Sequence, residues 1–371
     1  MGLFSPPRRS CFHLALLISA VCLLTGPSVF AQTGSEGSPV NAGPSWPPPV
    51  EPFGFSEAAL DSVFARAEAL DPLKSLLIAR GDVLVASRTY RGLQPGEAVN
   101  LKSASKSLLS LLVGIAIEEG HLQGVDQPIG PFFPQMLPDT SRKRAITIQD
   151  LLTMRAGLES TSFGNYGAWV SSDSWVRDAL RRPLVQEPGT GPMIYSTGTT
   201  HLLSAILTQA TGRPTRQYAQ ENLFDPLGLD IRAWQQDPEG IYFGGNNLST
   251  TPEALLRIGQ MVLRGGTTRD GTRVLPEGWI DDAWTVRVTR SYRGFNYGYL
   301  WWIEEFGGLR THFAWGYGGQ FLFVVPSLDL VVVMTSSLSN RPDGLQDHSG
   351  RLMRFFDRVV VPAATGHRMK F

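Results

Sequence analysis

The sequence predicts an α/β (α+β) protein with an antiparallel β-sheet, flanking helices and an inserted all-helical domain. Three features indicate this class: two paired apolar runs near the start, a helix-rich middle, and strand-like segments in the last third. Strands from both ends of a chain can join one sheet when the helices between them form an insertion. We therefore assign residues 53–130 and 250–371 to a sheet domain and residues 131–249 to a helical domain.

The first third predicts one helix and a hairpin. Ser56 precedes an apolar helical periodicity and is expected to cap that helix. Two apolar runs follow at 76–79 and 83–86, and the Arg80-Gly81-Asp82 between them is typical of a tight turn. This pair of strands forms the N-terminal part of the predicted sheet.

The middle of the chain alternates helix caps with apolar stripes. A long apolar helix is predicted over residues 105–119. Shorter helices are predicted over 147–154, 173–180 and 199–210. The second of these lies inside residues 158–190, which otherwise have the composition of a long irregular loop.

The last third returns to strand patterns. Residues 296–303 form an alternating aromatic segment, and residues 311–325 are predicted to be a strand with a glycine-rich opening. A buried apolar run follows at 330–334. A final helix over 350–361 is expected to pack against the sheet.

Composition places the protein among ordinary globular proteins. Of its 371 residues, 42% are hydrophobic and 18% are charged, and the formal net charge is zero. A chain without excess charge has no global field to attract nucleic acid or an anionic membrane. We therefore expect no nucleic-acid partner, and the sequence does not indicate an oligomeric state.

Residues 1–31 have the features of an export signal. A positively charged start is followed by an apolar run over 12–24, and Val29 and Ala31 are small residues of the kind that signal peptidase prefers. Cleavage after Ala31 would give a periplasmic or secreted protein with no stable membrane span; the alternative is a segment retained as a short membrane anchor. Residues 32–52, rich in Gly, Ser and Pro, are predicted to be a flexible linker.

Both cysteines, Cys11 and Cys22, lie inside the predicted signal. The mature chain would then have neither a disulfide nor a cysteine nucleophile. The sequence also lacks a His-Glu-x-x-His motif and a cysteine cluster, so we expect no metal and no other cofactor.

Ser103-Ala104-Ser105-Lys106, at the start of the long apolar helix, is the strongest indication of chemistry. Residues three apart share a helix face, so the Lys106 amine can reach the Ser103 hydroxyl. A serine hydroxyl needs a base to take its proton, and burial near a helix N-terminus can lower the pKa of a lysine enough for that role. The alternative is an N-cap serine followed by a solvated lysine, but the helix after Lys106 is almost entirely apolar.

Two later segments add groups that the same chemistry requires. Tyr195-Ser196-Thr197 follows a glycine-rich turn, and its phenol could move a proton between Ser103 and a leaving group. The alternative is a tyrosine that only packs. Residues 311–320 combine glycines with an apolar strand, whose edge could align a substrate and offer an N–H to an oxyanion.

Five further stretches add to these motifs, at residues 146–154, 187–190, 225–229, 297–302 and 326–333. Together, these motifs resemble the serine β-lactamase-related family, which includes class C β-lactamases, D-alanyl-D-alanine carboxypeptidases, family VIII esterases and 6-aminohexanoate-dimer hydrolases. The resemblance covers residues from about 53 to 365. It implies a β-lactamase/transpeptidase-like fold, with Ser103 as the nucleophile and with Lys106 and Tyr195 as general base and acid.

Residues 171–183 and 316–320 resemble the 6-aminohexanoate-dimer hydrolase branch of that family. Where the family has Tyr-x-Asn, this chain has Tyr195-Ser196-Thr197, with Thr197 in place of the asparagine. The nearest match to Lys-Thr-Gly or His-x-Gly is His312-Phe313-Ala314. The branch implies a tyrosine that contacts the substrate amide, for which Tyr166 is the candidate. The substrate-binding residues implied by the resemblance are Tyr166, Thr197, His312, Trp315 and Gly316.

The expected protein is an exported serine hydrolase that cleaves an amide or ester through a Ser-Lys-Tyr acyl-enzyme mechanism. Its partner would be a small amide, ester or peptide substrate. Two alternatives stay open, because loop shape decides the pocket. One is a D-alanyl-D-alanine carboxypeptidase or β-lactamase, although loss of the lysine of Lys-Thr-Gly weakens the case for a dedicated penicillinase. The other is a non-catalytic protein that binds peptide or β-lactam in the same cleft.

Overall fold

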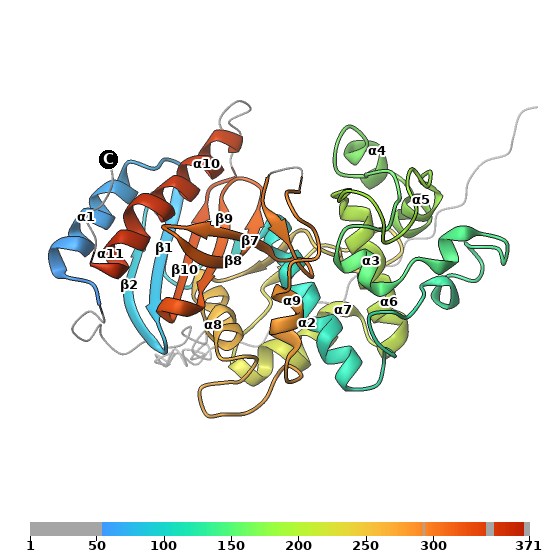
Figure 1. Cartoon of the computed structure of the whole chain (residues 1–371), viewed down its shortest axis with the longest axis horizontal. Coiled ribbons are helices and arrows are strands. Elements are labelled where there is room, and N and C mark those ends of the chain that lie inside the picture. The colour runs from blue at the N-terminus through green and yellow to red at the C-terminus, as the bar shows by residue number, and fades with distance from the viewer. Residues whose placement is uncertain (1–53, 292–293, 339–344, 367–371) are drawn as a thin grey trace, which may run out of the picture. The chain divides into compact units, whose positions relative to one another are not determined.

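A seven-stranded antiparallel sheet forms the centre of the described structure (Figure 1). Its strands are β1 (Leu73–Arg80), β2 (Val83–Thr89), β6 (Asn296–Tyr297), β7 (Trp302–Phe306), β8 (Leu309–Gly316), β9 (Gln320–Val325) and β10 (Leu330–Ser336). They are ordered β2-β1-β10-β9-β8-β7-β6, so the N-terminal hairpin lies beside the last strand of the chain. This order confirms the predicted antiparallel sheet built from both ends of the chain.

The computed structural model describes residues 54–291, 294–338 and 345–366. The predicted export signal, the linker and both cysteines lie outside the described residues, so their assignments stay predictions. Within the described part, no helix is both long enough and apolar enough to cross a membrane.

Helices provide most of the regular structure between β2 and β6. The α-helices are α1 (Glu57–Glu68), α2 (Ser105–Glu118), α3 (Ile148–Leu152), α4 (Tyr166–Val170), α5 (Trp175–Arg181), α6 (Thr197–Thr211), α7 (Thr215–Ala219), α8 (Pro252–Leu263), α9 (Trp279–Trp284), α10 (Leu345–Phe355) and α11 (Val361–Thr365). In Figure 1, α1, α10 and α11 lie together beside β1 and β2, and α3, α5 and α6 are grouped beyond β7. The four helices predicted in the middle of the chain are confirmed as α2, α3, α5 and α6.

Different segments seal the two faces of the sheet. On one face, Phe323 of β9 stacks on Phe356, which lies between α10 and α11, with ring centroids 4.0 Å apart. On the other face, α8 packs so closely that a Cβ atom at Gly259 would lie 2.6 Å from both Leu322 and Val331. Successive side chains of a strand point to opposite faces. Because both faces are covered, every residue of β9 and β10 is buried and most of these residues are apolar.

A second, smaller sheet links the turn before α2 to a distant segment. It consists of β3 (Val99–Asn100), β5 (Leu248–Thr250) and β4 (Ala233–Trp234), paired in the order β3-β5-β4. Since β3 leads into the turn that carries Ser103, β5 brings residues 244–247 towards the same turn. Strands of two or three residues are too short to show a period, so the sequence does not predict them.

The last third differs from its prediction in two places. The segment 296–303 holds two strands, β6 and β7, because the chain turns between them at Leu300, where φ is +60°. The segment 311–325 is the hairpin β8–β9 and not a single strand with a glycine-rich opening. Gly318 and Gly319 lie in its turn with φ values of +77° and +92°, which glycine adopts without strain.

The described residues belong to a single compact unit. The loop predicted over 158–190 contains α4 in addition to the predicted helix, α5. Helices α3 to α7 fall within residues 131–249, but β4 falls there too and β5 crosses the boundary at residue 249. The division into a sheet domain and an inserted helical domain therefore stays a prediction.

Candidate active site

Ser103 lies in a short 3-10 turn, Lys102–Ala104, that runs directly into α2. Lys106 follows in the first turn of α2, and its Nζ donates to Ser103 Oγ at 3.1 Å. The spacing of three residues places both side chains on one side of the helix start, as the motif predicts. The hydroxyl of Ser103 therefore has a potential base in direct contact.

Lys106 is buried despite its amine, with only 2% of its surface exposed. Its Nζ also donates to Gly245 O at 2.7 Å and to Thr197 Oγ1 at 3.3 Å. These oxygens satisfy the amine and direct it towards Ser103. Because burial disfavours the charged form, it lowers the pKa of Lys106 to about 7, which suits a general base near neutral pH.

Tyr195 lies beside the same amine, just before α6. The centroid of its ring is 5.2 Å from Lys106 Nζ. Ser160 Oγ donates to the Tyr195 carbonyl at 2.7 Å, and the tyrosine ring stacks on Trp302 of β7 with centroids 6.0 Å apart. The fold thus brings the three residues predicted to be catalytic into one site, although they come from segments far apart in the chain.

Thr197, which stands where the family pattern has asparagine, contacts the lysine. Its Oγ1 accepts from Lys106 Nζ and shares a 2.9 Å hydrogen bond with Ser162 Oγ. Ser162 Oγ also accepts from the Thr197 N–H at 2.8 Å, at the start of α6. Thr197 is therefore part of the polar surroundings of the amine, and its predicted contact with substrate stays a prediction.

We call the surroundings of the Lys106 amine, formed by Ser103, Thr197 and Gly245, the lysine pocket. A glycine pair, Gly244-Gly245, forms the wall of this pocket opposite α2. A Cβ atom at Gly245, where φ is +78°, would lie 2.4 Å from Lys106 Cγ. A Cβ atom at Gly244 would lie 2.3 Å from the carbonyl oxygen of Thr200. Only glycine allows this close approach, which lets the Gly245 carbonyl reach the amine.

Tyr166 lies near the same wall. Asn246 Nδ2 donates to Tyr166 Oη at 3.0 Å, and the Asn247 N–H donates to Asn246 Oδ1 at 2.9 Å. Burial raises the pKa of Tyr166, so its hydroxyl keeps its proton at neutral pH. Asn246 directly follows Gly245, so the phenol contacts the residue next to the glycine pair, and its predicted contact with substrate stays a prediction.

The end of β8 is the strand edge next to Ser103. A Cβ atom at Gly316 would lie 2.2 Å from the carbonyl oxygen of Leu101, in the turn that leads to Ser103. The strand segment at the site is therefore Ala314-Trp315-Gly316. The triplet matched from sequence, His312-Phe313-Ala314, ends two residues before Gly316, and that match stays a prediction.

His312 lies further back on β8. Its ring stacks on Trp284 of α9 with centroids 4.0 Å apart, and only 4% of its surface is exposed. Burial and the Arg310 guanidinium lower the pKa of His312 to about 3, so the imidazole is neutral. The His312 side chain packs against α9 four residues before the glycine that meets the nucleophile turn, and its predicted contact with substrate stays a prediction.

Aromatic side chains surround the site. Phe163 and Tyr317 are each 54% exposed. The ring of Phe163 lies 6.2 Å from that of Tyr195, and the ring of Trp315 lies 5.7 Å from that of Trp302. Aromatic walls with a few convergent polar groups favour a substrate with an apolar part.

Sequence reasoning missed a polar cluster next to the nucleophile. Lys102 Nζ donates to Asn247 Oδ1 at 2.9 Å, and Asn100 Nδ2 donates to the same oxygen at 3.1 Å. Burial lowers the pKa of Lys102. The available signal was the run Gly244-Gly245-Asn246-Asn247, a glycine pair followed by two amides, which could have marked a close backbone approach.

The groups gathered around Ser103 are amines, phenols, hydroxyls and amides, which suit proton transfer and hydrogen bonding. Among the described residues, no three His, Cys, Asp or Glu side chains gather as a metal site would require.

The beta-lactamase family pattern matches residues 74–354, a range that includes every residue of the site. The chain belongs to the beta-lactamase family. Members of this family are serine hydrolases, including amidases and esterases. The resemblance predicted from the ordered motifs is confirmed.

Individual relatives agree with this assignment. A 6-aminohexanoate-dimer hydrolase from Paenarthrobacter ureafaciens is 27% identical over 288 residues, which cover 71% of this chain and 72% of that protein. The structure of an octameric penicillin-binding protein homologue from Pyrococcus abyssi is 19% identical with a TM-score of 0.64, covering 84% of this chain and 78% of that chain. EstCE1, a hydrolase with promiscuous acyltransferase activity, is 20% identical with a TM-score of 0.62, and the match covers 79% of this chain and 97% of that chain. These structures confirm the β-lactamase/transpeptidase-like fold.

Proposed function

We propose that this beta-lactamase family member is an exported serine hydrolase that cleaves an amide or ester through an acyl-enzyme on Ser103. The observation that carries the proposal is the 3.1 Å hydrogen bond between Lys106 Nζ and Ser103 Oγ, made by a lysine whose pKa burial lowers to about 7. A buried amine is expensive to desolvate, and a well-packed apolar side chain would serve packing alone at lower cost. A role as the base for Ser103 accounts for its presence.

Acylation begins when Ser103 Oγ attacks the carbonyl carbon of the substrate and its proton passes to neutral Lys106 Nζ. The bond to the leaving group then breaks as the Tyr195 hydroxyl donates a proton to that group, and Tyr195 takes up the proton that Lys106 holds, so both residues return to their starting states. In deacylation, water adds to the acyl carbon and gives a proton to neutral Lys106. The acyl–Oγ bond then breaks, Tyr195 donates its proton to Ser103 Oγ and takes up the proton from Lys106, and the acid is released.

Two backbone N–H groups are candidates to stabilise the oxyanion. The first belongs to Ser103, at the start of a helical segment. The second comes from the end of β8, since Gly316 packs against the turn that carries Ser103. Removal of one such donor typically reduces the rate about 10²- to 10³-fold.

The substrate that we propose is a small amide or ester with an apolar portion. Its support is the aromatic side chains next to Tyr195 together with the neutral phenol of Tyr166, which we expect to hydrogen-bond the substrate amide. The relative that acts on the 6-aminohexanoate dimer, an amide, agrees with this choice. Trp315 is the residue that we expect to contact the apolar portion.

Hydrolysis of a short-chain nitrophenyl ester by the protein and by its Ser103→Ala variant tests the proposal. We expect the native protein to turn over the ester and the variant to lose at least about 10³-fold in rate. Equal rates would remove Ser103 from the mechanism. A native protein that is acylated without turnover would instead be a binding protein. Parallel assays with a linear amide, a D-alanyl-D-alanine peptide and a β-lactam would separate the amidase from the carboxypeptidase and β-lactamase alternatives.

A further inference from the structure

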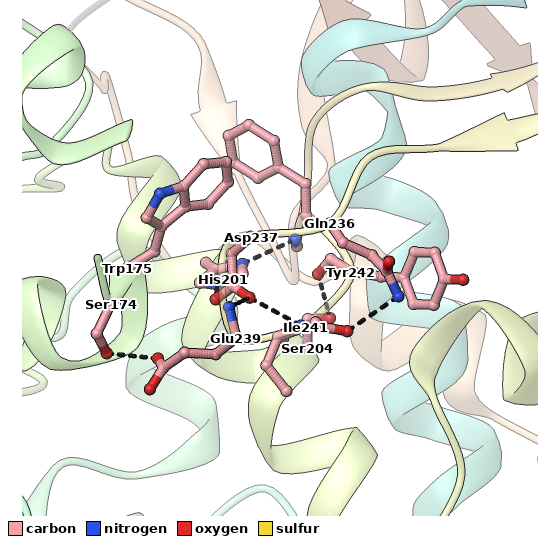
Figure 2. Close-up of polar contacts among 12 residues, drawn as sticks. Ser174, Trp175, His201, Ser204, Gln236, Asp237, Glu239, Ile241 and Tyr242 are labelled. Carbon is pink, nitrogen blue, oxygen red and sulfur yellow. Dashed lines mark hydrogen bonds and ion pairs between the residues drawn. The ribbon is translucent and has the colours of Figure 1, made fainter. Parts of the chain in front are cut away.

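A buried histidine–aspartate pair, His201 and Asp237, contacts the first residue of the glycine pair Gly244-Gly245. Figure 2 shows the surroundings of His201 and Asp237. His201 Nε2 of α6 lies 3.0 Å from Asp237 Oδ2, and both side chains are 0% exposed. The rings of Trp169, Trp175 and Phe243 pack around the imidazole, with centroids 5.5 to 6.0 Å away. Desolvating such a pair costs free energy that apolar side chains filling the same space would not incur.

The contacts select one neutral tautomer of His201. Asp237 Oδ1 accepts the N–H groups of Glu239 and Ile241 at 2.9 Å and 2.8 Å, as a carboxylate would. Nε2 of the imidazole must then carry the proton that points to Asp237. Nδ1 keeps a lone pair, which accepts the Gly244 N–H at 3.2 Å.

Gly244 connects this pair to the lysine. Thr200 Oγ1 donates to the Gly244 carbonyl at 2.9 Å, so the N–H and the C=O of this glycine are both held by side chains of α6. The next residue, Gly245, offers its carbonyl to Lys106 Nζ at 2.7 Å, the shortest hydrogen bond of that amine. The direction of the Gly245 carbonyl therefore depends on how Gly244 is held.

Other contacts hold the segment 236–244 without involving the imidazole. Ser204 Oγ of α6 donates to the Tyr242 carbonyl at 2.6 Å. Ser174, just before α5, donates to the Glu239 carboxylate (Figure 2). These supports should keep the segment folded when the imidazole is replaced, so the imidazole can be tested by substitution.

We propose that His201 and Asp237 are positioning residues for Lys106. They hold Gly244 in place, and the Gly245 carbonyl then keeps the amine directed at the nucleophile. The inference rests on the proposed function, in which Lys106 is the base. Misplacement of a catalytic group by about 1 Å can cost about 10²-fold in rate, so this buried pair can influence the reaction without touching the substrate.

Two substitutions separate the hydrogen bonds of His201. Asparagine carries an oxygen in the position of Nδ1, so it can still accept the Gly244 N–H but does not reach Asp237. Glutamine carries an amide nitrogen in the position of Nε2, so it can still donate to Asp237 but leaves the Gly244 N–H without its acceptor. Each variant loses one buried hydrogen bond, and we expect both to have a lower Tm.

Kinetics with a nitrophenyl ester should distinguish the two variants. His201→Gln should lower kcat about 10²-fold with little change in KM, since a misdirected base affects chemistry more than binding. His201→Asn should keep most of the native kcat. Thr335→Val is the control: Thr335 of β10 is fully buried and shares a 2.6 Å hydrogen bond with Ser75 of β1 in the central sheet, so this variant should lower the Tm and leave kcat unchanged.

Hydrogen–deuterium exchange over residues 240–247 provides a readout that does not require turnover. We expect faster exchange in His201→Gln than in His201→Asn or the native protein. Equal exchange in the two variants would overturn the proposal, and so would faster exchange in His201→Gln with a native kcat. If the native protein does not hydrolyse the ester, the proposed function fails, and exchange still decides whether His201 holds Gly244.

Discussion

Two walls meet at Lys106, and they are built in different ways. The wall on α2 is local, because Ser103 and Lys106 are three residues apart at the start of one helix. The opposite wall is assembled over long distances: Thr197 and Gly245 reach the same amine across 91 and 139 residues of sequence. Helix geometry alone therefore pairs the nucleophile with its base, whereas tertiary structure decides where the amine points.

The walls also differ in how they tolerate change. Helix α2 is buried continuously from Ser105 to Ala116, so apolar packing holds it. The opposite wall depends on a glycine at positive φ and on buried hydrogen bonds, where one methyl group or one lost acceptor has a direct effect on the lysine. Substitutions in the two walls should differ accordingly.

The largest effect is expected in the local wall. Lys106→Met keeps an apolar stem of similar length and removes the amine, so α2 should fold while the base is lost. We expect kcat/KM for a nitrophenyl ester to fall about 10³-fold. Ser105→Ala is the matched control, because Ser105 Oγ donates to the Lys102 carbonyl and its loss should leave the rate close to native. A native rate in Lys106→Met would exclude the lysine from catalysis.

The next effect tests the opposite wall. Gly245→Ala would place a methyl group 2.4 Å from Lys106 Cγ in a residue with φ of +78°. We expect kcat to fall about 10²-fold and the free energy of unfolding to fall by about 1–3 kcal/mol. Gly271→Ala separates strain from contact, since Gly271 has φ of +89° but open space around its Cβ position. It should lose stability and keep its activity; equal losses of activity would contradict a direct effect on the lysine.

A smaller effect is expected for the pH dependence of the rate, because both walls contact the Lys106 amine. Burial lowers the pKa of Lys106 to about 7, and only the neutral amine can accept the serine proton. The rate should therefore rise with pH, by about tenfold from about pH 6 to about pH 8. Lys106→Met should abolish this rise. A native profile that is flat across this range, in protein whose circular dichroism is unchanged, would argue against Lys106 as the base.

The smallest effect concerns substrate choice. Tyr166→Phe removes the hydroxyl that accepts from Asn246 at 3.0 Å and leaves the ring in place. We expect kcat/KM for an amide to fall about fivefold, the usual value of one hydrogen bond, and the ester rate to change less. Tyr218→Phe, whose hydroxyl donates to the Glu119 carboxylate at 2.7 Å, is a matched control for loss of a tyrosine hydrogen bond. Equal losses for amide and ester would remove Tyr166 from amide recognition.

The parts of the protein with a period or a short motif could be predicted from sequence. The Ser-x-x-Lys contact follows from helix spacing, and Ser56 and Thr147 act as the helix caps that their positions indicate. The hairpin β1–β2 and the buried strand β10 were likewise predictable from their apolar patterns.

The remaining parts depend on contacts that have no local pattern. The alternation of strand β8 does not show which of its residues meets the Ser103 turn; the close approach of Gly316 to Leu101 decides that. The helical pattern around His201 predicts that this residue is buried. It does not predict the partner of the imidazole, since Asp237 lies 36 residues later in an irregular segment. The Gly245 carbonyl is a backbone group, and no side-chain motif predicts where it points.

Labelling with a fluorophosphonate tests the central claim most directly, since this probe reacts covalently with an activated serine hydroxyl. The mass of the labelled peptide 103–106 would be measured for the native protein and for the Ser103→Ala and Ser105→Ala variants. The account predicts one adduct in the native protein and in Ser105→Ala, and none in Ser103→Ala. An adduct that persists in Ser103→Ala, or that disappears in Ser105→Ala alone, would contradict the assignment of Ser103 as the nucleophile held by Lys106.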